Sequence, residues 1–217
     1  MLLTQQIETA STAARRRILS HSGEPLLLAD WMRVLMIHFE VDADALQRGV
    51  PYELDLHEGR AFVSLVAFTM ENMRPRLGGR AGAWLFKPIA THHFLNVRAY
   101  VRFNGEPGIH FLAEWLSSAL AVKLGPATFG LPYRFGKMNY DHEWQNGELR
   151  GKVTDVLTKS AFEYQATLNI AAPFASCETG SLEEWLMERY TAFNRVGRRS
   201  EERRVGKECR SRWSPYH

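Results

Sequence analysis

Apolar and polar residues alternate along residues 94–116, and this alternation is the clearest pattern in the chain. Alternation predicts strands, and the turn-forming cluster from Asn104 to Gly108 divides this stretch into two of them. We therefore predict a β hairpin in which Phe103 pairs with Ile109. This register gives one apolar face, made of Leu95, Val97, Ala99, Val101, Phe103, Phe111, Ala113 and Trp115.

The opposite face of this hairpin is largely polar. Its members are Asn96, Arg98, Tyr100, Arg102, His110, Leu112 and Glu114. The predicted register places Arg98 opposite Glu114, which is a favourable cross-strand charge pair. These polar positions are therefore the first candidates for a binding site.

Similar patterns predict strands over residues 26–41, 54–57, 61–73, 133–144, 149–158 and 162–171. The turn at Glu58-Gly59 joins the second and third of these segments. Asn-Gly is a strong signal for a two-residue hairpin turn, so Asn146-Gly147 joins the next two and sets Asp141 opposite Lys152. The strand from residue 61 is apolar on both faces, which predicts a central and buried position.

Helices are predicted over residues 4–20, 42–48 and 117–125, and a fourth after Ser181. Ser181 and Glu184 form a capping box, and the apolar residues that follow at helical spacing are Leu182, Trp185, Leu186, Tyr190 and Phe193. Residues 73–87 contain four proline or glycine residues and are predicted to be a loop, either a rim or lid or a disordered segment. About eight strands with few helices predict a mostly β (α+β) barrel or sandwich with peripheral helices.

Three segments, FLNVRAYV, GEPGIHFLAEWL and FGLPYRFGKM, resemble the YqjF-like family, also called DUF2071. That family belongs to the acetoacetate decarboxylase-like superfamily, and the resemblance covers residues 31–193. It implies an antiparallel β-barrel formed by residues 1–198 as a single domain. The family has no established biochemical activity, so the resemblance predicts a fold rather than a reaction.

The resemblance also bears on catalysis. Decarboxylases of this superfamily form a Schiff base on a lysine whose pKa a second lysine lowers. That pair falls at Tyr133 and Arg134 here, and a glutamate of those enzymes falls at about Phe94. Both departures argue against acetoacetate decarboxylase activity. Lys137, on the same strand face as Tyr133, can replace the missing amine, although a solvated strand lysine is the simpler interpretation.

The last nineteen residues, 199–217, resemble a translated sequencing adapter and are predicted to be a foreign, disordered tail. A natural basic, disordered C-terminus is the alternative. The tail holds six of the 27 basic and three of the 24 acidic residues, which leaves 21 of each in residues 1–198. The net charge of +3 therefore comes from the tail and predicts no nucleic-acid partner. The natural chain is expected to continue beyond Gly197 with more strand.

Three functions are compatible with these patterns. The first is binding of a small anionic organic ligand, a carboxylate or keto acid, inside the barrel. Arg98 would hold its carboxylate, with Asn96, Tyr100, Glu114 and Tyr133 around it; a structural Arg98–Glu114 ion pair and aromatic core filling are the alternatives. The second is a Schiff-base decarboxylase or aldolase that uses Lys137. The third is a non-catalytic interaction module that uses residues 73–87.

Other chemistry lacks its sequence signals. The chain has no HxH, HExxH or CxxC spacing, no GxSxG elbow and no phosphate-binding glycine loop, so neither a metal nor a cofactor is predicted. Cys177 is the only cysteine before the tail, which excludes a disulfide framework. There is no long apolar stretch and no secretory signal, so a cytoplasmic protein without a membrane partner is expected. Whether it is an enzyme or a homo-oligomer stays open.

Overall fold

The computed structural model describes residues 27–129, 131, 133–142, 145, 147–172, 175, 177–189, 191–196 and 199–203. Its strands are β1 (Leu27–Val41), β2 (Glu53–Leu54), β3 (Ala61–Pro75), β4 (His92–Phe103), β5 (Glu106–Leu116), β6 (Tyr133–Asp141), β7 (Glu148–Asp155), β8 (Ala161–Thr167), β9 (Ala192–Val196) and β10 (Arg199–Arg203). Its helices are α2 (Ala43–Gly49), α3 (Gly79–Phe86), the 3-10 helix η1 (Lys87–Ile89), α4 (Ala119–Phe129) and α5 (Leu182–Met187). The helix predicted over residues 4–20 lies outside the described residues.

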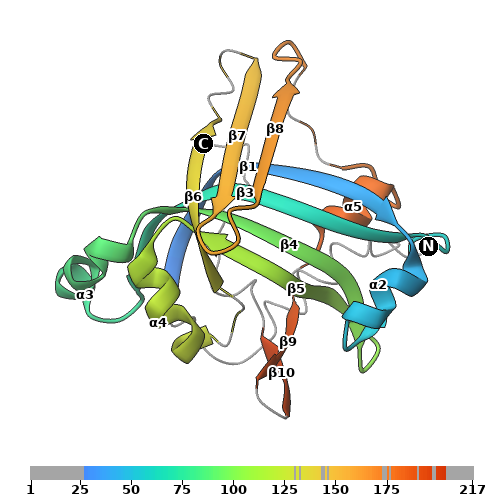
Figure 1. Ribbon diagram of the computed structural model, residues 1–217, viewed down its shortest axis with the longest axis horizontal. Coiled ribbons are helices and arrows are strands. Elements are labelled where there is room, and N and C mark those ends of the chain that lie inside the picture. Colours follow the sequence, from blue (N-terminus) through green and yellow to red (C-terminus); the bar gives the residue numbers. More distant parts are fainter. Residues whose placement is uncertain are drawn as a thin grey trace, which may run out of the picture.

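The strands form one curled sheet in the order β1-β3-β4-β5-β6-β7-β8, with β2 on β4 and the β9–β10 pair on β5 (Figure 1). The prediction of a mostly β fold with peripheral helices is confirmed. The sheet differs from a closed antiparallel barrel in two respects. The β5–β6 pair is parallel, and, among the described residues, β1 pairs only with β3 and β8 only with β7.

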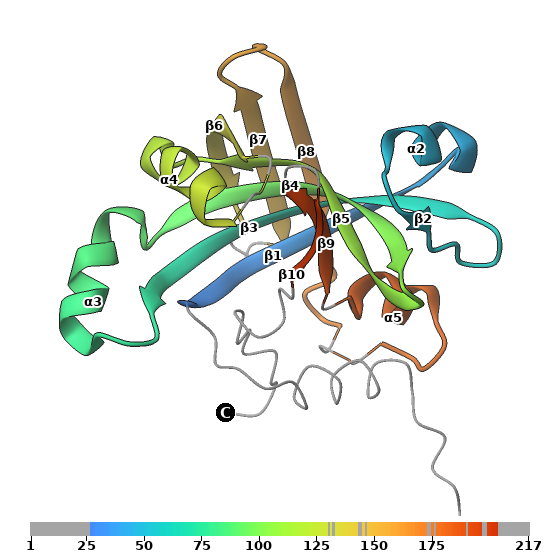
Figure 2. The ribbon, with the colours of Figure 1, turned by 90° about the horizontal axis from the view of Figure 1, so that it is seen from below.

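Strands β1 to β5 form an arched layer, and the other elements pack on its two faces. Figure 2 shows β6 to β8 and α2 on one side of this layer and α5 on the other. Apolar residues of β6 to β8, such as Met138 and Val153, pack on Ala67 and Leu95 of the arch. Burial of both faces explains why β3 is apolar on both sides.

The central hairpin, β4–β5, has a different register from the predicted one. Phe103 pairs with Glu106, because Asn104 and Gly105 both adopt a positive φ, 51° and 78°, and close a two-residue turn. The predicted pairing of Arg98 with Glu114 is therefore wrong. Glu114 lies opposite Asn96 instead.

A β-bulge then divides the hairpin. Val97 pairs with Ala113 whereas Arg98 pairs with Phe111, so Leu112 is the additional residue on β5. The bulge moves Phe111 onto the face that carries Glu114, which corrects its predicted place on the apolar face. On β4 the alternation is as predicted, and Asn96 lies on the concave side of the arch.

Two other predicted pairings are also corrected. β2 pairs with β4 rather than with β3, although the chain does turn at Glu58-Gly59 through a single bridge between His57 and Arg60. In the β6–β7 hairpin Asp141 lies opposite Arg150, two residues from the predicted register.

Residues 73–87 are not a loop. β3 continues to Pro75, and α3 and η1 follow directly. Gly78 and Gly79 have positive φ values of 99° and 50° and allow the chain to turn into α3. The predicted signal for the end of α4 was also misleading, since that helix continues past Gly125 to Phe129.

The capping box at the start of α5 is confirmed. The Ser181 side chain accepts a hydrogen bond from Glu184 N at 3.1 Å, and the Glu184 carboxylate accepts one from Gly180 N at 2.8 Å. The helix is shorter than predicted: it ends at Met187, and Phe193 belongs to β9. Tyr190 lies outside the described residues.

The described residues begin with β1 and end with β10. Residues 199–203, at the start of the segment set apart in the sequence, form β10 and pair with β9. The foreign origin of residues 199–217 stays a prediction.

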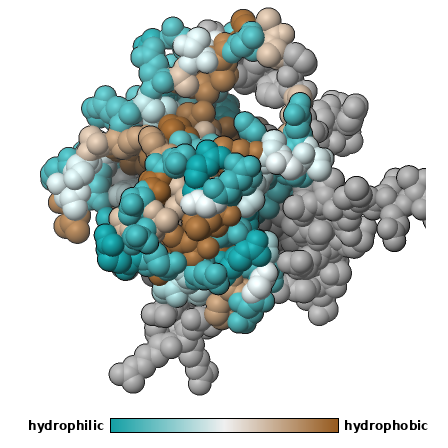
Figure 3. Space-filling model, turned by 90° about the vertical axis from the view of Figure 1, so that its right-hand side faces the viewer, coloured by the Kyte–Doolittle hydropathy of each residue, from teal (hydrophilic) through white to brown (hydrophobic). Residues whose placement is uncertain are grey.

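The face turned toward the viewer in Figure 3, on the side of α2, carries hydrophobic patches between hydrophilic ones. No described helix is both long and apolar enough to span a bilayer.

Candidate functional site

A cavity of about 490 Å³ lies on the concave side of the arch. Its floor comes from β1, β3, β4 and β5, and its rim from α3, η1, α4 and the start of β6. Most side chains that line it are apolar, among them Phe68, Phe94 and Leu116. Size and apolar lining are typical of a site for a small organic molecule.

The strand register orders the cavity floor into three rows. Asn96, Glu114 and Tyr133 face one another across β4, β5 and β6. The next row consists of Phe68, Phe94 and Leu116, and the third of Trp31, Met70 and His92. A purely apolar row therefore separates two rows that contain polar side chains.

Glu114 is the most unusual group in the cavity. Its side chain is almost completely buried, and its Oε2 atom has no hydrogen-bond partner. Burial without a compensating cation raises its pKa to about 8. At neutral pH Glu114 is thus mostly a neutral carboxylic acid, able to donate a proton in a hydrogen bond.

Other polar groups of the cavity also lack partners. The Oδ1 atom of Asn96 and Nε1 of Trp31 are buried without a hydrogen bond, and neither ring nitrogen of His92 has one of good geometry, although an interaction with the backbone of Ile89 partly offsets the effect of burial on its pKa. Burial lowers the pKa of His92 to about 4, so its ring is neutral at physiological pH. Buried polar groups are normally satisfied, and several unsatisfied ones around one cavity indicate a ligand site.

The Tyr133 ring reaches the cavity because Gly125 of α4 has no side chain in the space that the ring fills. A Cβ atom on Gly125 would lie 2.2 Å from a carbon of the Tyr133 ring. Only glycine permits this close approach, and both residues line the cavity.

Arg98 and Tyr100 lie farther along β4 and do not belong to the cavity lining. The Arg98 guanidinium donates to the carbonyl oxygen of Leu186 at 3.1 Å, and the Tyr100 hydroxyl donates to the same oxygen at 3.0 Å. Among the described residues no carboxylate lies within ion-pair distance of Arg98. Both side chains therefore hold the end of α5 against the arch.

A short polar chain extends from this contact. The Tyr100 hydroxyl lies 2.6 Å from Ser64 Oγ, which lies 2.6 Å from Nδ1 of His38. Burial, and secondarily the charge of Arg98, lowers the pKa of His38 to about 4. These side chains satisfy one another, unlike those around the cavity.

Lys137 lies far from this chemistry. It is exposed on β6 opposite Thr154 and does not line the cavity. No lysine occurs among the described residues that form the cavity wall. The six residues predicted for the site are therefore divided. Asn96, Glu114 and Tyr133 meet at the cavity, Arg98 and Tyr100 support α5, and Lys137 faces solvent.

Trp31 and His92 were not among the predicted site residues. Trp31 lies within a predicted strand and His92 directly before another. No local sequence pattern indicates that the two strands bring them to the same cavity. They meet only through Met70, which pairs with Trp31 on one side and with His92 on the other.

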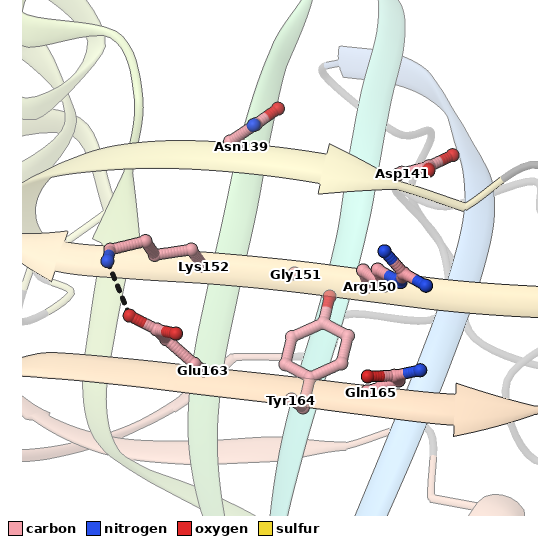
Figure 4. Close-up of a pocket in the computed structure, with 8 residues that line it drawn as sticks. All are labelled: Asn139, Asp141, Arg150, Gly151, Lys152, Glu163, Tyr164 and Gln165. Carbon is pink, nitrogen blue, oxygen red and sulfur yellow. Dashed lines mark ion pairs between the residues drawn. The ribbon is translucent and has the colours of Figure 1, made fainter.

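A second, shallower depression lies on the β6–β8 strands (Figure 4). An exposed ion pair between Lys152 and Glu163 crosses it, and Tyr164 lies over Gly151. Exposed ion pairs contribute little energy, and none of the polar atoms there is buried and unpaired. We place no site at this surface. Within the described residues, no group of His, Cys, Asp and Glu is arranged to hold a metal.

Comparison with solved structures defines the class of this fold. The acetoacetate decarboxylase of Legionella pneumophila superposes with a TM-score of 0.54 at 15% identity, covering 88% of this chain and 69% of that one. The enduracididine biosynthesis enzyme MppR, solved with the condensation product of pyruvate and imidazole 4-carboxaldehyde, gives 0.50 at 19% identity, covering 68% and 57%. The chain thus has an acetoacetate decarboxylase-like fold.

Sequence comparison defines the family. Residues 28–214 match the model of DUF2071, described as an uncharacterized conserved protein. The uncharacterized protein YqjF of Bacillus subtilis (strain 168) is 34% identical over 171 residues, 75% of this chain and 65% of that protein. The chain therefore belongs to the DUF2071 family. It spans slightly less than two thirds of the length of YqjF.

Proposed function

We propose that the cavity binds a small organic molecule that has a mostly apolar body and a carbonyl or carboxyl group at one end. Glu114 and Asn96 would form hydrogen bonds with this polar end, and Tyr133 would lie beside it. The observation that carries the proposal is the buried carboxyl group of Glu114, whose Oε2 atom has no hydrogen-bond partner, in a mostly apolar cavity.

A keto acid remains the first class of compound to test, since MppR was also solved with pyruvate bound. Arg98 is left out of the proposed site because it does not line the cavity and its Nη2 atom donates to Leu186, although its Nε atom is buried without a hydrogen bond. In the proposal a carboxylic acid enters as the neutral acid, or shares one proton with Glu114. Arg98 and Tyr100 then act by positioning α5.

The direct test is a calorimetric screen of ketones, carboxylic acids and keto acids. Because Glu114 donates only when protonated, we expect the affinity for a ketone to be constant below pH 8 and to fall about tenfold per pH unit above it. Asn96→Leu and Glu114→Leu should abolish detectable binding. Arg98→Met should change the affinity for acids less than about threefold, because the guanidinium lies outside the cavity lining and donates to Leu186 and Met36 rather than into the cavity.

Two outcomes would contradict the proposal. If no compound binds the wild-type protein, the cavity is not a site for this class of ligand. If Arg98→Met removes binding of acids while ketones still bind, the guanidinium is the anchor and Glu114 is not.

Lysine trapping checks the enzymatic alternative. We expect no borohydride-stable adduct with acetoacetate or pyruvate, because Lys137 is exposed and the described cavity wall contains no lysine. Mass spectrometry of the digested protein measures this, with Lys137→Arg as the matched control. An adduct on Lys137 that disappears in Lys137→Arg would show that the Schiff-base mechanism operates.

A further inference from the structure

The rim of the cavity exposes large apolar side chains. Leu77, Trp84 and Leu85, in and just before α3, are 74%, 75% and 69% exposed. On α4, Leu120 and Leu124 are 45% and 50% exposed. α3 and α4 lie at the same end of the molecule in both ribbon views (Figures 1 and 2). Since Leu124 also lines the cavity, this end contains the cavity mouth.

The charged side chains of α3, α4 and the residues just before α3 are all basic. Basic residues at this end are Arg74, Arg76, Arg80, Lys87 and Lys123. The sequence contains no aspartate or glutamate between Glu71 and Glu106, and none between Glu114 and Asp141. Residues 1–198 as a whole hold 21 basic and 21 acidic residues, so the basic excess of these segments is offset by acidic residues elsewhere in the chain.

We propose that this end of the protein, α3 with the start of α4, docks on the surface of an anionic lipid bilayer. A short helix that exposes Trp and Leu beside Arg and Lys is suited to the headgroup region. Its apolar side chains enter the boundary of the acyl chains, while its basic side chains contact the lipid phosphates. A peripheral contact of this kind requires no membrane-spanning stretch.

Charge complementarity selects the bilayer over other partners. In a symmetric dimer each patch would face its own copy, which would bring like charges together. Single-stranded nucleic acid prefers aromatic platforms, whereas four of the five exposed apolar side chains here are leucines. An anionic bilayer satisfies both the charge and the aliphatic character.

Docking in this orientation turns the cavity mouth toward the lipid. A mostly apolar ligand could then pass from the bilayer into the cavity without crossing water. Membrane docking itself does not depend on the proposed ligand, so the two proposals are tested separately.

The test is co-sedimentation with vesicles of phosphatidylcholine alone or of equimolar phosphatidylcholine and phosphatidylglycerol. We expect binding to the anionic vesicles only, weakening strongly between about 0.1 M and 0.5 M salt. Arg80→Glu with Lys87→Glu should reduce partitioning at least about 25-fold, on the basis of about fivefold per basic residue. Trp84→Glu with Leu85→Glu should reduce it about tenfold or more.

Two matched controls lie elsewhere on the surface. Leu157→Glu changes an apolar side chain that is 90% exposed in the turn after β7, and Arg48→Glu changes an exposed basic residue of α2. Both should bind vesicles like the wild type. Circular dichroism verifies that each variant is folded, and the two pairs of substitutions in α3 and at the start of η1 test the same surface independently.

Three results would overturn the proposal. The first is no binding to anionic vesicles at low salt. The second is binding that the α3 substitutions leave unchanged. The third is a concentration-dependent dimer that Trp84→Glu dissociates, which would identify a second copy as the partner.

Discussion

Glu114→Gln is expected to stabilise the protein by roughly 3 kcal/mol at pH 7 and to raise Tm by roughly 6–12 °C. The pKa of Glu114 is about 8 in the folded state, against an ordinary value of 4.5. Between these two pH values the folded chain keeps a proton that the unfolded chain has lost. Wild-type stability therefore falls by about 1.4 kcal/mol per pH unit as the pH rises through this window.

Glutamine carries no titrating proton, so the variant should lack this contribution to the pH dependence. Thermal and urea unfolding from pH 4 to pH 9 measure the difference, which should be small near pH 4.5, grow with pH and level off above about pH 8. Glu53→Gln, at an exposed position of β2, is the control and should change stability by less than about 0.5 kcal/mol. Parallel pH profiles for the wild type and Glu114→Gln would show that Glu114 is ionised in the folded protein.

Asp55→Ala should destabilise the protein by about 3–5 kcal/mol. The Asp55 carboxylate accepts from Nη1 of Arg189 at 2.6 Å, and both side chains are about 95% buried, with 4% and 5% exposed. Removing the carboxylate leaves the Arg189 guanidinium buried without an anion, stacked 4.3 Å from the Trp185 ring centroid. Urea unfolding measures the loss.

The expected loss is also local, because Arg189 follows α5. Hydrogen exchange should show earlier opening of residues 182–187. In this segment the carbonyl oxygen of Leu186 accepts hydrogen bonds from Arg98 and Tyr100. Arg102→Ala removes the other partner of Asp55, at 2.7 Å, but Arg102 is 45% exposed. Its loss should cost about 1 kcal/mol or less. Equal losses for Asp55→Ala and Arg102→Ala would contradict this ranking.

The predictions of helix caps, which depend on residues close together in the sequence, were confirmed. Asp42 caps α2 through a 2.7 Å hydrogen bond from Ala45 N, as its position before an apolar-periodic segment predicts. The Ser181 capping box formed as well. The Asn104-Gly105 turn could also have been predicted, since Asn-Gly is a two-residue hairpin signal, but the following Pro107 and Gly108 suggested a longer loop.

The candidate site was predictable only in part. Alternation on β4 places Asn96 on the concave face, but Glu114 reaches that face only through the bulge, because the observed two-residue turn alone would set Ala113 opposite Asn96. The pairing of Glu114 with Asn96, rather than with Arg98, depends on the turn length and on the bulge at Leu112. Residues 79–89 form α3 and η1 at the rim of the cavity although the glycines and the proline of residues 73–87 predicted a loop.

The sequence by itself determined the strands, the main turns, the helix caps and the family, because these depend on the chemistry of neighbouring residues. Tertiary structure alone decided which polar side chains line the cavity and which lie outside it. It brought Trp31, His92, Asn96 and Glu114 together, and it separated Arg98 and Lys137 from them. The physical reason is that burial, and with it the unusual pKa of Glu114, comes from strands paired over long sequence distances, a relation that no local pattern contains.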